Sequence, residues 1–113
     1  MTLEQLKNFG ADTEEGMARC MDNEEFYFKM IGLALSEESL ETLGKQLSEK
    51  KLDDAFETAH ALKGVYGNLS LTPLLSPVSE MTELLRARTD TDYSEFFNKA
   101  VSKRDELKAL YEA

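Results

Sequence analysis

Residues 53–70 read DDAFETAHALKGVYGNLS, and the spacing of the apolar side chains in this stretch decides the fold. The apolar residues recur at intervals of three and four, which is the spacing of one face of a helix. They are Ala55, Phe56, Ala59, Leu62, Val65, Tyr66 and Leu69. The stretch therefore predicts an amphipathic helix that packs on a core, with Asp53 as a candidate N-cap residue.

Similar helical spacing extends over most of the chain. No segment alternates apolar and polar residues for long enough to predict a strand. We therefore expect an all-α protein, an antiparallel four-helix bundle with one or two short N-terminal helices packed on it. Residues 2–21 should form the short helices and residues 23–112 the bundle, within a single domain that spans residues 1–113.

Capping residues mark where several of these helices should begin and end. Gly10 is expected to end the first short helix. Asp12 or Thr13 can cap the second short helix, and Asn23 can cap the helix that follows. Ser36 offers a further cap, which leaves open whether the chain after Asn23 forms one bent helix or two consecutive helices.

Two prolines follow the central helix, and each removes a backbone hydrogen-bond donor. The next helix must therefore begin near Pro73 with a kink, or begin at Pro77 behind Ser76. Residues 89–92 read TDTD and predict a loop. Asp92 and Glu95 resemble a capping pair in front of the last helix.

Size, charge and cysteine content exclude several classes of function. The chain has 113 residues, 13 Lys and Arg against 22 Asp and Glu, and a formal net charge of -9. A chain of this size supports one modest core. The acidic balance argues against binding to nucleic acid or to anionic membranes, and no apolar segment is long enough to span a bilayer. A single thiol, Cys20, cannot form an internal disulfide, so we expect a cytoplasmic location.

The polar stripe beside the apolar face of the central helix is the candidate site. His60, Lys63, Gly64 and Gly67 lie at i, i+3, i+4 and i+7, which should place the only histidine at the surface. Each glycine within a helix costs about 0.5–1 kcal/mol relative to alanine, so two of them indicate a local need for space. Gly67 is either part of a docking surface or simply a C-cap, and Tyr66 is either a core aromatic or part of that surface.

These residue types suit a histidine that accepts a phosphoryl group. An imidazole has an ordinary pKa of about 6.5 and is largely a neutral nucleophile at pH 7. Lys63 could offset the added negative charge, and Gly64 could leave room for a donor. Phosphoryl transfer depends mostly on positioning and charge, so a partner can supply the metal. The sequence has no Gly-rich loop for ATP, and one Cys and one His cannot form a structural zinc site.

The segment His60-Ala61-Leu62-Lys63-Gly64, followed by Asn68-Leu69, resembles the signature of histidine-containing phosphotransfer (HPt) domains. The resemblance implies a phosphocarrier rather than an enzyme. His60 would be phosphorylated, Lys63 would balance the phosphoryl charge, Gly64 would permit close approach, and Asn68 would be a polar residue near the histidine. At Ser70 the chain departs from the family, which frequently has glycine there.

The resemblance also implies partners and a place in a relay. The partners would be receiver domains of a hybrid sensor histidine kinase and of a response regulator, with Mg²⁺ bound by the receiver and no cofactor in this chain. We expect a monomer. Two alternatives remain: a helical adaptor that binds receivers or other signalling proteins without transferring phosphate, and the dimerising hairpin of a sensor kinase. The second is disfavoured because Ala61 stands where that family has an acidic residue.

Overall fold

The computed structural model describes residues 1–113 and consists of seven α-helices without a strand. The prediction of an all-α fold is confirmed. No helix is both long enough and apolar enough to cross a membrane. The helices are α1 (Leu3–Phe9), α2 (Thr13–Arg19), α3 (Glu24–Ser36), α4 (Ser39–Ser48), α5 (Leu52–Asn68), α6 (Thr72–Arg86) and α7 (Ser94–Glu112).

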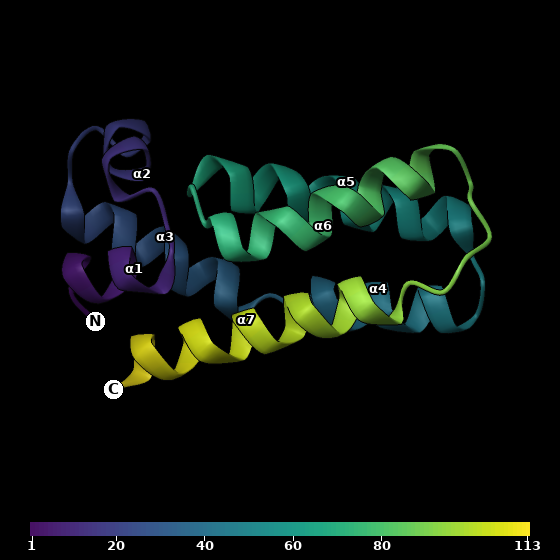
Figure 1. Ribbon diagram of the computed structural model, residues 1–113. Coiled ribbons are helices and arrows are strands. Elements are labelled where there is room, and N and C mark those ends of the chain that lie inside the picture. Colours follow the sequence, from purple (N-terminus) through teal and green to yellow (C-terminus); the bar gives the residue numbers. More distant parts are fainter.

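The longer helices form an elongated antiparallel bundle (Figure 1). α5 packs between α4 and α6, and α6 packs against α7. α3 and α4 follow one another along the same side of the bundle, so together they take the place of its first helix. α1 and α2 lie together at one end of the molecule, where α1 packs against α7 and α2 packs against α3, and this matches the expected four-helix bundle with two short N-terminal helices.

The chain between Asn23 and Lys51 forms two helices rather than one bent helix. Glu37 has an extended backbone, with φ -73° and ψ 145°, and this residue separates α3 from α4. The prediction that Ser36 caps the second helix is wrong. Its hydroxyl donates a hydrogen bond to the carbonyl of Leu33 (2.9 Å) in the last turn of α3, and Glu38 occupies the N-cap position of α4.

The predicted caps of the N-terminal region are confirmed. The carboxylate of Asp12 accepts a hydrogen bond from the amide of Glu15 (3.1 Å), and the side chain of Asn23 accepts one from Phe26 (3.0 Å). Gly10 ends α1 with a φ of +118°, a backbone conformation that favours glycine.

Two other predicted caps are wrong, because each helix begins at a different residue. The amide of Ala55 already bonds to the carbonyl of Lys51, so α5 begins at Leu52 and Asp53 lies inside its first turn. At α7 the N-cap is Tyr93. Asp92 accepts a hydrogen bond from the amide of Ser94 (2.9 Å) but stands one residue before the cap.

Both prolines belong to α6. Pro73 lies in the first turn, and Pro77 lies inside the helix. The start near Pro73 is therefore the correct alternative. The missing donor at Pro77 falls early in the helix, where it leaves only the carbonyl of Pro73 without its usual partner.

The buried face of α5 orients the candidate site. Its fully buried residues are spaced by three and four: Ala55, Ala59, Leu62 and Tyr66. α3 is tied to the end of α5 by the buried hydroxyl of Tyr27, which donates a hydrogen bond to the carbonyl of Leu69 (2.7 Å). Burial raises the pKa of Tyr27 to about 12. With this face fixed in the core, the stripe that contains the histidine must face outward.

Candidate functional site

The C-terminal end of α5 places Gly67 inside the helix. The amide of Ser70 bonds to the carbonyl of Gly67 (3.1 Å), and the amide of Leu71 bonds to the carbonyl of Tyr66 (3.0 Å). This pair of bonds is the Schellman ending, in which one residue takes the left-handed conformation. That residue is Ser70, with a φ of +55°. The C-cap interpretation of Gly67 is therefore wrong.

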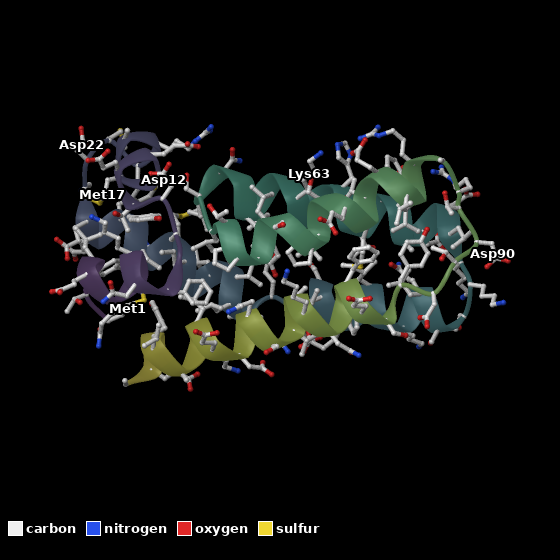
Figure 2. All side chains as sticks on the ribbon, viewed as in Figure 1. Met1, Asp12, Met17, Asp22, Lys63 and Asp90 are labelled. Carbon is white, nitrogen blue, oxygen red and sulfur yellow. The ribbon has the colours of Figure 1, made fainter.

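The structure brings the five sequence-predicted residues together on one face of α5. His60, Gly64 and Asn68 are exposed, while Lys63 and Gly67 are partly buried. All five line an open depression of about 400 Å³. Figure 2 shows Lys63 projecting away from the bundle on this side of the molecule.

Three further residues line the depression, and they come from other helices. Glu15 and Arg19 belong to α2, and Leu75 belongs to α6. Arg19 pairs with Glu15 across one helical turn (3.1 Å). Sequence reasoning missed these residues because local spacing carries no information on which helices pack beside α5.

No contact within the chain requires glycine at the two helical positions of the site. A Cβ built at Gly64 would meet no atom within 4 Å, and one at Gly67 would approach only Leu75 Cδ1, at 3.8 Å. Alanine at either position would favour the helix by about 0.5–1 kcal/mol. The packing of this chain therefore gives no reason for these glycines, which is consistent with a surface that another molecule approaches.

Lys63 is engaged in an ion pair that sequence reasoning did not foresee. Its Nζ lies 3.3 Å from Oε2 of Glu83 on α6, and Oε1 of Glu83 lies 3.3 Å from Nε of Arg86. Hydrogen bonds from Arg86 and Lys63 hold the pKa of Glu83 below its ordinary value. The side chains of Lys63 and Glu83 are 36% and 56% exposed. Exposed pairs contribute little free energy, so the ammonium group can exchange Glu83 for a stronger anion.

The imidazole of His60 contacts the ring of Phe56, one helical turn earlier. The two ring centroids lie 5.5 Å apart, and the planes meet at 15°. The guanidinium carbons of Arg86 and Arg88 lie 5.1 Å and 4.9 Å from the centroid of the Phe56 ring. The sequence places Phe56 on the apolar face of the helix. Its i, i+4 relation to His60 is the signal that could have indicated this contact.

Tyr66 belongs to the core. Its side chain is only 2% exposed, and burial raises its pKa to about 12. The alternative in which Tyr66 forms part of a docking surface is therefore wrong.

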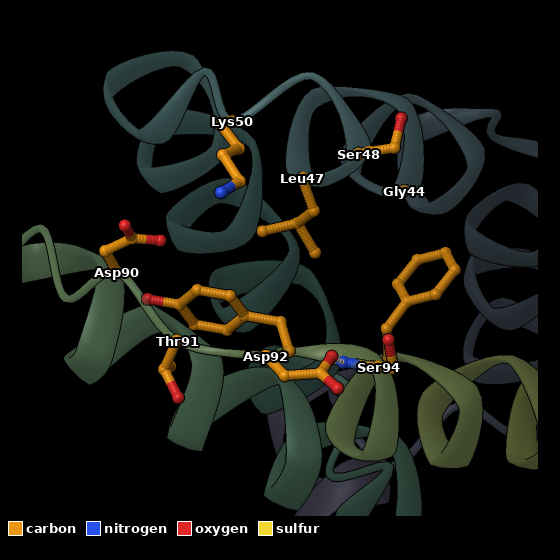
Figure 3. A pocket seen from close by; sticks show the side chains of 10 residues that line it. Gly44, Leu47, Ser48, Lys50, Asp90, Thr91, Asp92 and Ser94 are labelled. Atoms are coloured by element: carbon orange, nitrogen blue, oxygen red, sulfur yellow. Dashed lines mark hydrogen bonds between the residues drawn. The ribbon is translucent and has the colours of Figure 1, made fainter.

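A second cavity, of about 420 Å³, lies where the C-terminal end of α4 faces the loop before α7. Figure 3 shows Leu47 and Lys50 on one side of it and Asp90 and Asp92 on the other. None of the five sequence-predicted site residues lines this cavity. This cavity is therefore separate from the depression that contains His60.

Comparison with protein families defines the class of protein. The model of the Hpt domain matches residues 33–113, more than two thirds of the sequence, and the chain therefore belongs to the Hpt domain family. Hpt domains are phosphotransfer carriers rather than kinases; they serve histidine phosphotransfer in phosphorelays and interact with receiver domains. No curated protein and no solved structure gave a significant match.

The family match has a definite position on the fold. It begins within α3 and covers α4 to α7, including all five sequence-predicted site residues. α1 and α2 lie outside the match, so the contribution of Arg19 and Glu15 to the depression comes from a part of the chain that the family model does not cover.

Proposed function

We propose that this protein is an intermediate of a multistep two-component phosphorelay. In this proposal His60 accepts a phosphoryl group from the aspartate of one receiver domain and passes it to the aspartate of another. The observation that carries the proposal is the stripe of His60, Lys63 and Gly64 on the outer face of α5, in a chain of the Hpt domain family.

The chemistry requires little from this chain beyond the nucleophile and its surroundings. The outer ring nitrogen of His60 attacks the phosphorus of the aspartyl phosphate. An N–P bond forms as the P–O bond to the carboxylate breaks, and the carboxylate remains on the receiver. The proton on the other ring nitrogen exchanges with water. Transfer to the second receiver is the reverse of this step. Mg²⁺ would be bound by the receiver, and we propose no cofactor or metal site for this chain.

The neighbouring residues of the stripe would support the phosphorylated histidine and the docked partner. Lys63 lies one turn from His60 and would exchange Glu83 for the phosphoryl oxygens, which carry more charge than a carboxylate. Gly64 and Gly67 would admit the receiver surface, because neither position carries a side chain that projects into the depression. Asn68 would offer a polar group at the far end of the depression.

The partners in this proposal are receiver domains of a hybrid sensor histidine kinase and of a response regulator. The chain would act as a monomer in the cytoplasm. The net charge of -9 supports a protein partner rather than nucleic acid, since phosphate contacts need clustered cations. Light scattering tests the monomer, and a stable dimer would instead favour the dimerising hairpin of a sensor kinase.

The direct test is transfer of label from a phosphorylated receiver domain to the wild type and to His60→Gln. We expect acid-labile label on the wild type and none on the variant. His60 is the only histidine, so no second histidine can accept the group. Equal labelling of both proteins would refute the proposal. Absence of label on the wild type, with receiver binding unchanged in His60→Gln, would instead support the non-transferring adaptor.

A further inference from the structure

The ring of Phe56 is the one side chain that stacks on the imidazole of His60. We propose that Phe56 is a positioning residue that holds this imidazole in the orientation needed for phosphoryl transfer. The effect on transfer rests on the function proposed above. The ordering of the ring does not, and it can be measured separately.

The stack orients the histidine without occupying its nucleophile. The lone pair of a neutral imidazole nitrogen lies in the plane of the ring, whereas the contact with Phe56 uses the face of the ring, at an interplanar angle of 15°. Neither ring nitrogen of His60 takes part in a hydrogen bond with another residue of the chain, although such bonds commonly orient functional histidines. A phosphoryl group attached in the ring plane would therefore leave the stack intact.

Phe56 can act as a fixed support because it is itself held in place. Its side chain is partly buried and packs against the hydrophobic core. Two guanidinium groups, one from the last residue of α6 and one from the turn after it, lie within about 5 Å of its ring, an arrangement that favours attraction to the aromatic face. Arg88 is in turn fixed by a hydrogen bond to the carbonyl of Leu85 (2.7 Å) and by its ion pair with Asp53.

An exposed histidine needs such a support because its outer torsion angle is only weakly restricted. A docked receiver presents its phosphorus from one direction, so only imidazoles with a nitrogen pointing along that direction can react. Aromatic pairs typically contribute enough interaction free energy to change a conformational equilibrium by about two- to tenfold. That range is the loss of transfer rate expected when the stack is removed.

Two substitutions and one control test the proposal. Phe56→Leu keeps an apolar side chain but removes the ring, and Phe56→Tyr keeps the ring. Phe97→Leu makes the same change on α7, where the ring packs over Gly44, outside the depression. The His60 ring protons can be assigned without ambiguity, because the chain has one histidine. We expect their upfield ring-current shifts to persist in Phe56→Tyr and Phe97→Leu and to vanish in Phe56→Leu. Nuclear Overhauser contacts to the aromatic protons of residue 56 should likewise persist in Phe56→Tyr and Phe97→Leu.

The transfer measurement uses two donors. With a phosphorylated receiver domain that labels the wild type, Phe56→Leu should react about two- to tenfold more slowly, while Phe56→Tyr and Phe97→Leu retain the wild-type rate. With phosphoramidate, a small donor that approaches from any direction, all four proteins should react alike. Unchanged His60 ring shifts in Phe56→Leu, or transfer from the receiver at the wild-type rate, would overturn the proposal. If no receiver labels the wild type, the relay function fails, and the ring shifts alone decide whether Phe56 orders the imidazole.

Discussion

The glycines within the helices occupy two contrasting regions: the seams, where a helix packs against an aromatic ring of another helix, and the outer face of α5. At Gly44 a Cβ would come within 2.5 Å of Cζ of Phe97, and at Gly16 it would overlap the hydroxyl of Tyr27. At Gly64 it would meet no atom within 4 Å. In the seams, glycine makes room for an aromatic ring of the same chain. On the open face, no residue of the chain uses the space, so the same residue type there points to another molecule.

The largest expected effect is the loss of stability when a side chain is added at a glycine in a seam. Gly16→Ala should lower the free energy of unfolding by about 2–4 kcal/mol, because overpacking and loss of a buried hydrogen bond act together. The displaced group is the hydroxyl of Tyr27, which bonds to the carbonyl of Leu69 and joins α3 to the end of α5. Urea unfolding measures the change. The matched control is Gly64→Ala, which should raise stability by about 0.5–1 kcal/mol. Similar changes in both variants would contradict the distinction between the two regions.

Filling the open face should affect transfer rather than folding. Gly64→Gln places a long side chain in the depression that contains His60. We expect transfer from a phosphorylated receiver to fall by at least about tenfold, since a misplacement of about 1 Å can cost more than that. The urea midpoint should not fall, because glutamine is a better helix former than glycine. Exchange at the wild-type rate would show that the empty space around Gly64 has no role in docking.

The ion pair between Lys63 and Glu83 should give smaller effects of opposite sign. In Lys63→Ala the fraction of phosphoryl group held on His60, at equilibrium with a receiver, should fall about three- to tenfold, as expected for one partly exposed charge-assisted contact. In Glu83→Gln that fraction should rise about two- to fivefold, because Lys63 loses the anion that competes for it.

Matched variants separate this charge effect from a general change in net charge. Lys99 on α7 and Glu80 on α6 are exposed and form no ion pair, so Lys99→Ala and Glu80→Gln should leave the equilibrium near the wild-type value. A decrease in Glu83→Gln, or the same increase in Glu80→Gln, would refute the competition between Glu83 and the phosphoryl group.

Sequence reasoning recovered the features that depend on local spacing. The helical face of α5 and the polar stripe from His60 to Gly67 follow from intervals of three and four, and the caps Asp12 and Asn23 follow from side chains that reach amides three residues away. It failed at Ser36, whose hydroxyl bonds backward within α3 and cannot cap the next helix.

Contacts between helices could not be predicted from the sequence. Lys63 and Glu83 are separated by 20 residues, and nothing in the spacing of either helix specifies that the two side chains meet. The seam at Gly44 depends in the same way on how α4 lies against Phe97 of α7. The stack of Phe56 on His60 is different, because both residues lie in one helix. It follows from their i, i+4 spacing, although Phe56 was assigned to the apolar face and His60 to the polar stripe.

Ser70 has a backbone conformation that favours glycine. Substitution at this position should give the smallest change in stability. α1 ends at Gly10 with a positive φ, and α5 ends at Ser70 with a φ of +55°. The hydroxyl of Ser70 is also buried without a hydrogen-bond partner.

Ser70→Gly should raise the free energy of unfolding by about 0.5–1 kcal/mol. The substitution removes the left-handed strain and the unpaired hydroxyl, and the greater chain entropy of glycine in the unfolded state offsets part of this gain. Urea unfolding of Ser70→Gly and Ser70→Ala separates the two causes, because alanine removes the hydroxyl but keeps the strain. A gain in alanine equal to that in glycine would assign the whole effect to the hydroxyl. Glycine at this position would then serve no conformational purpose, unlike Gly10.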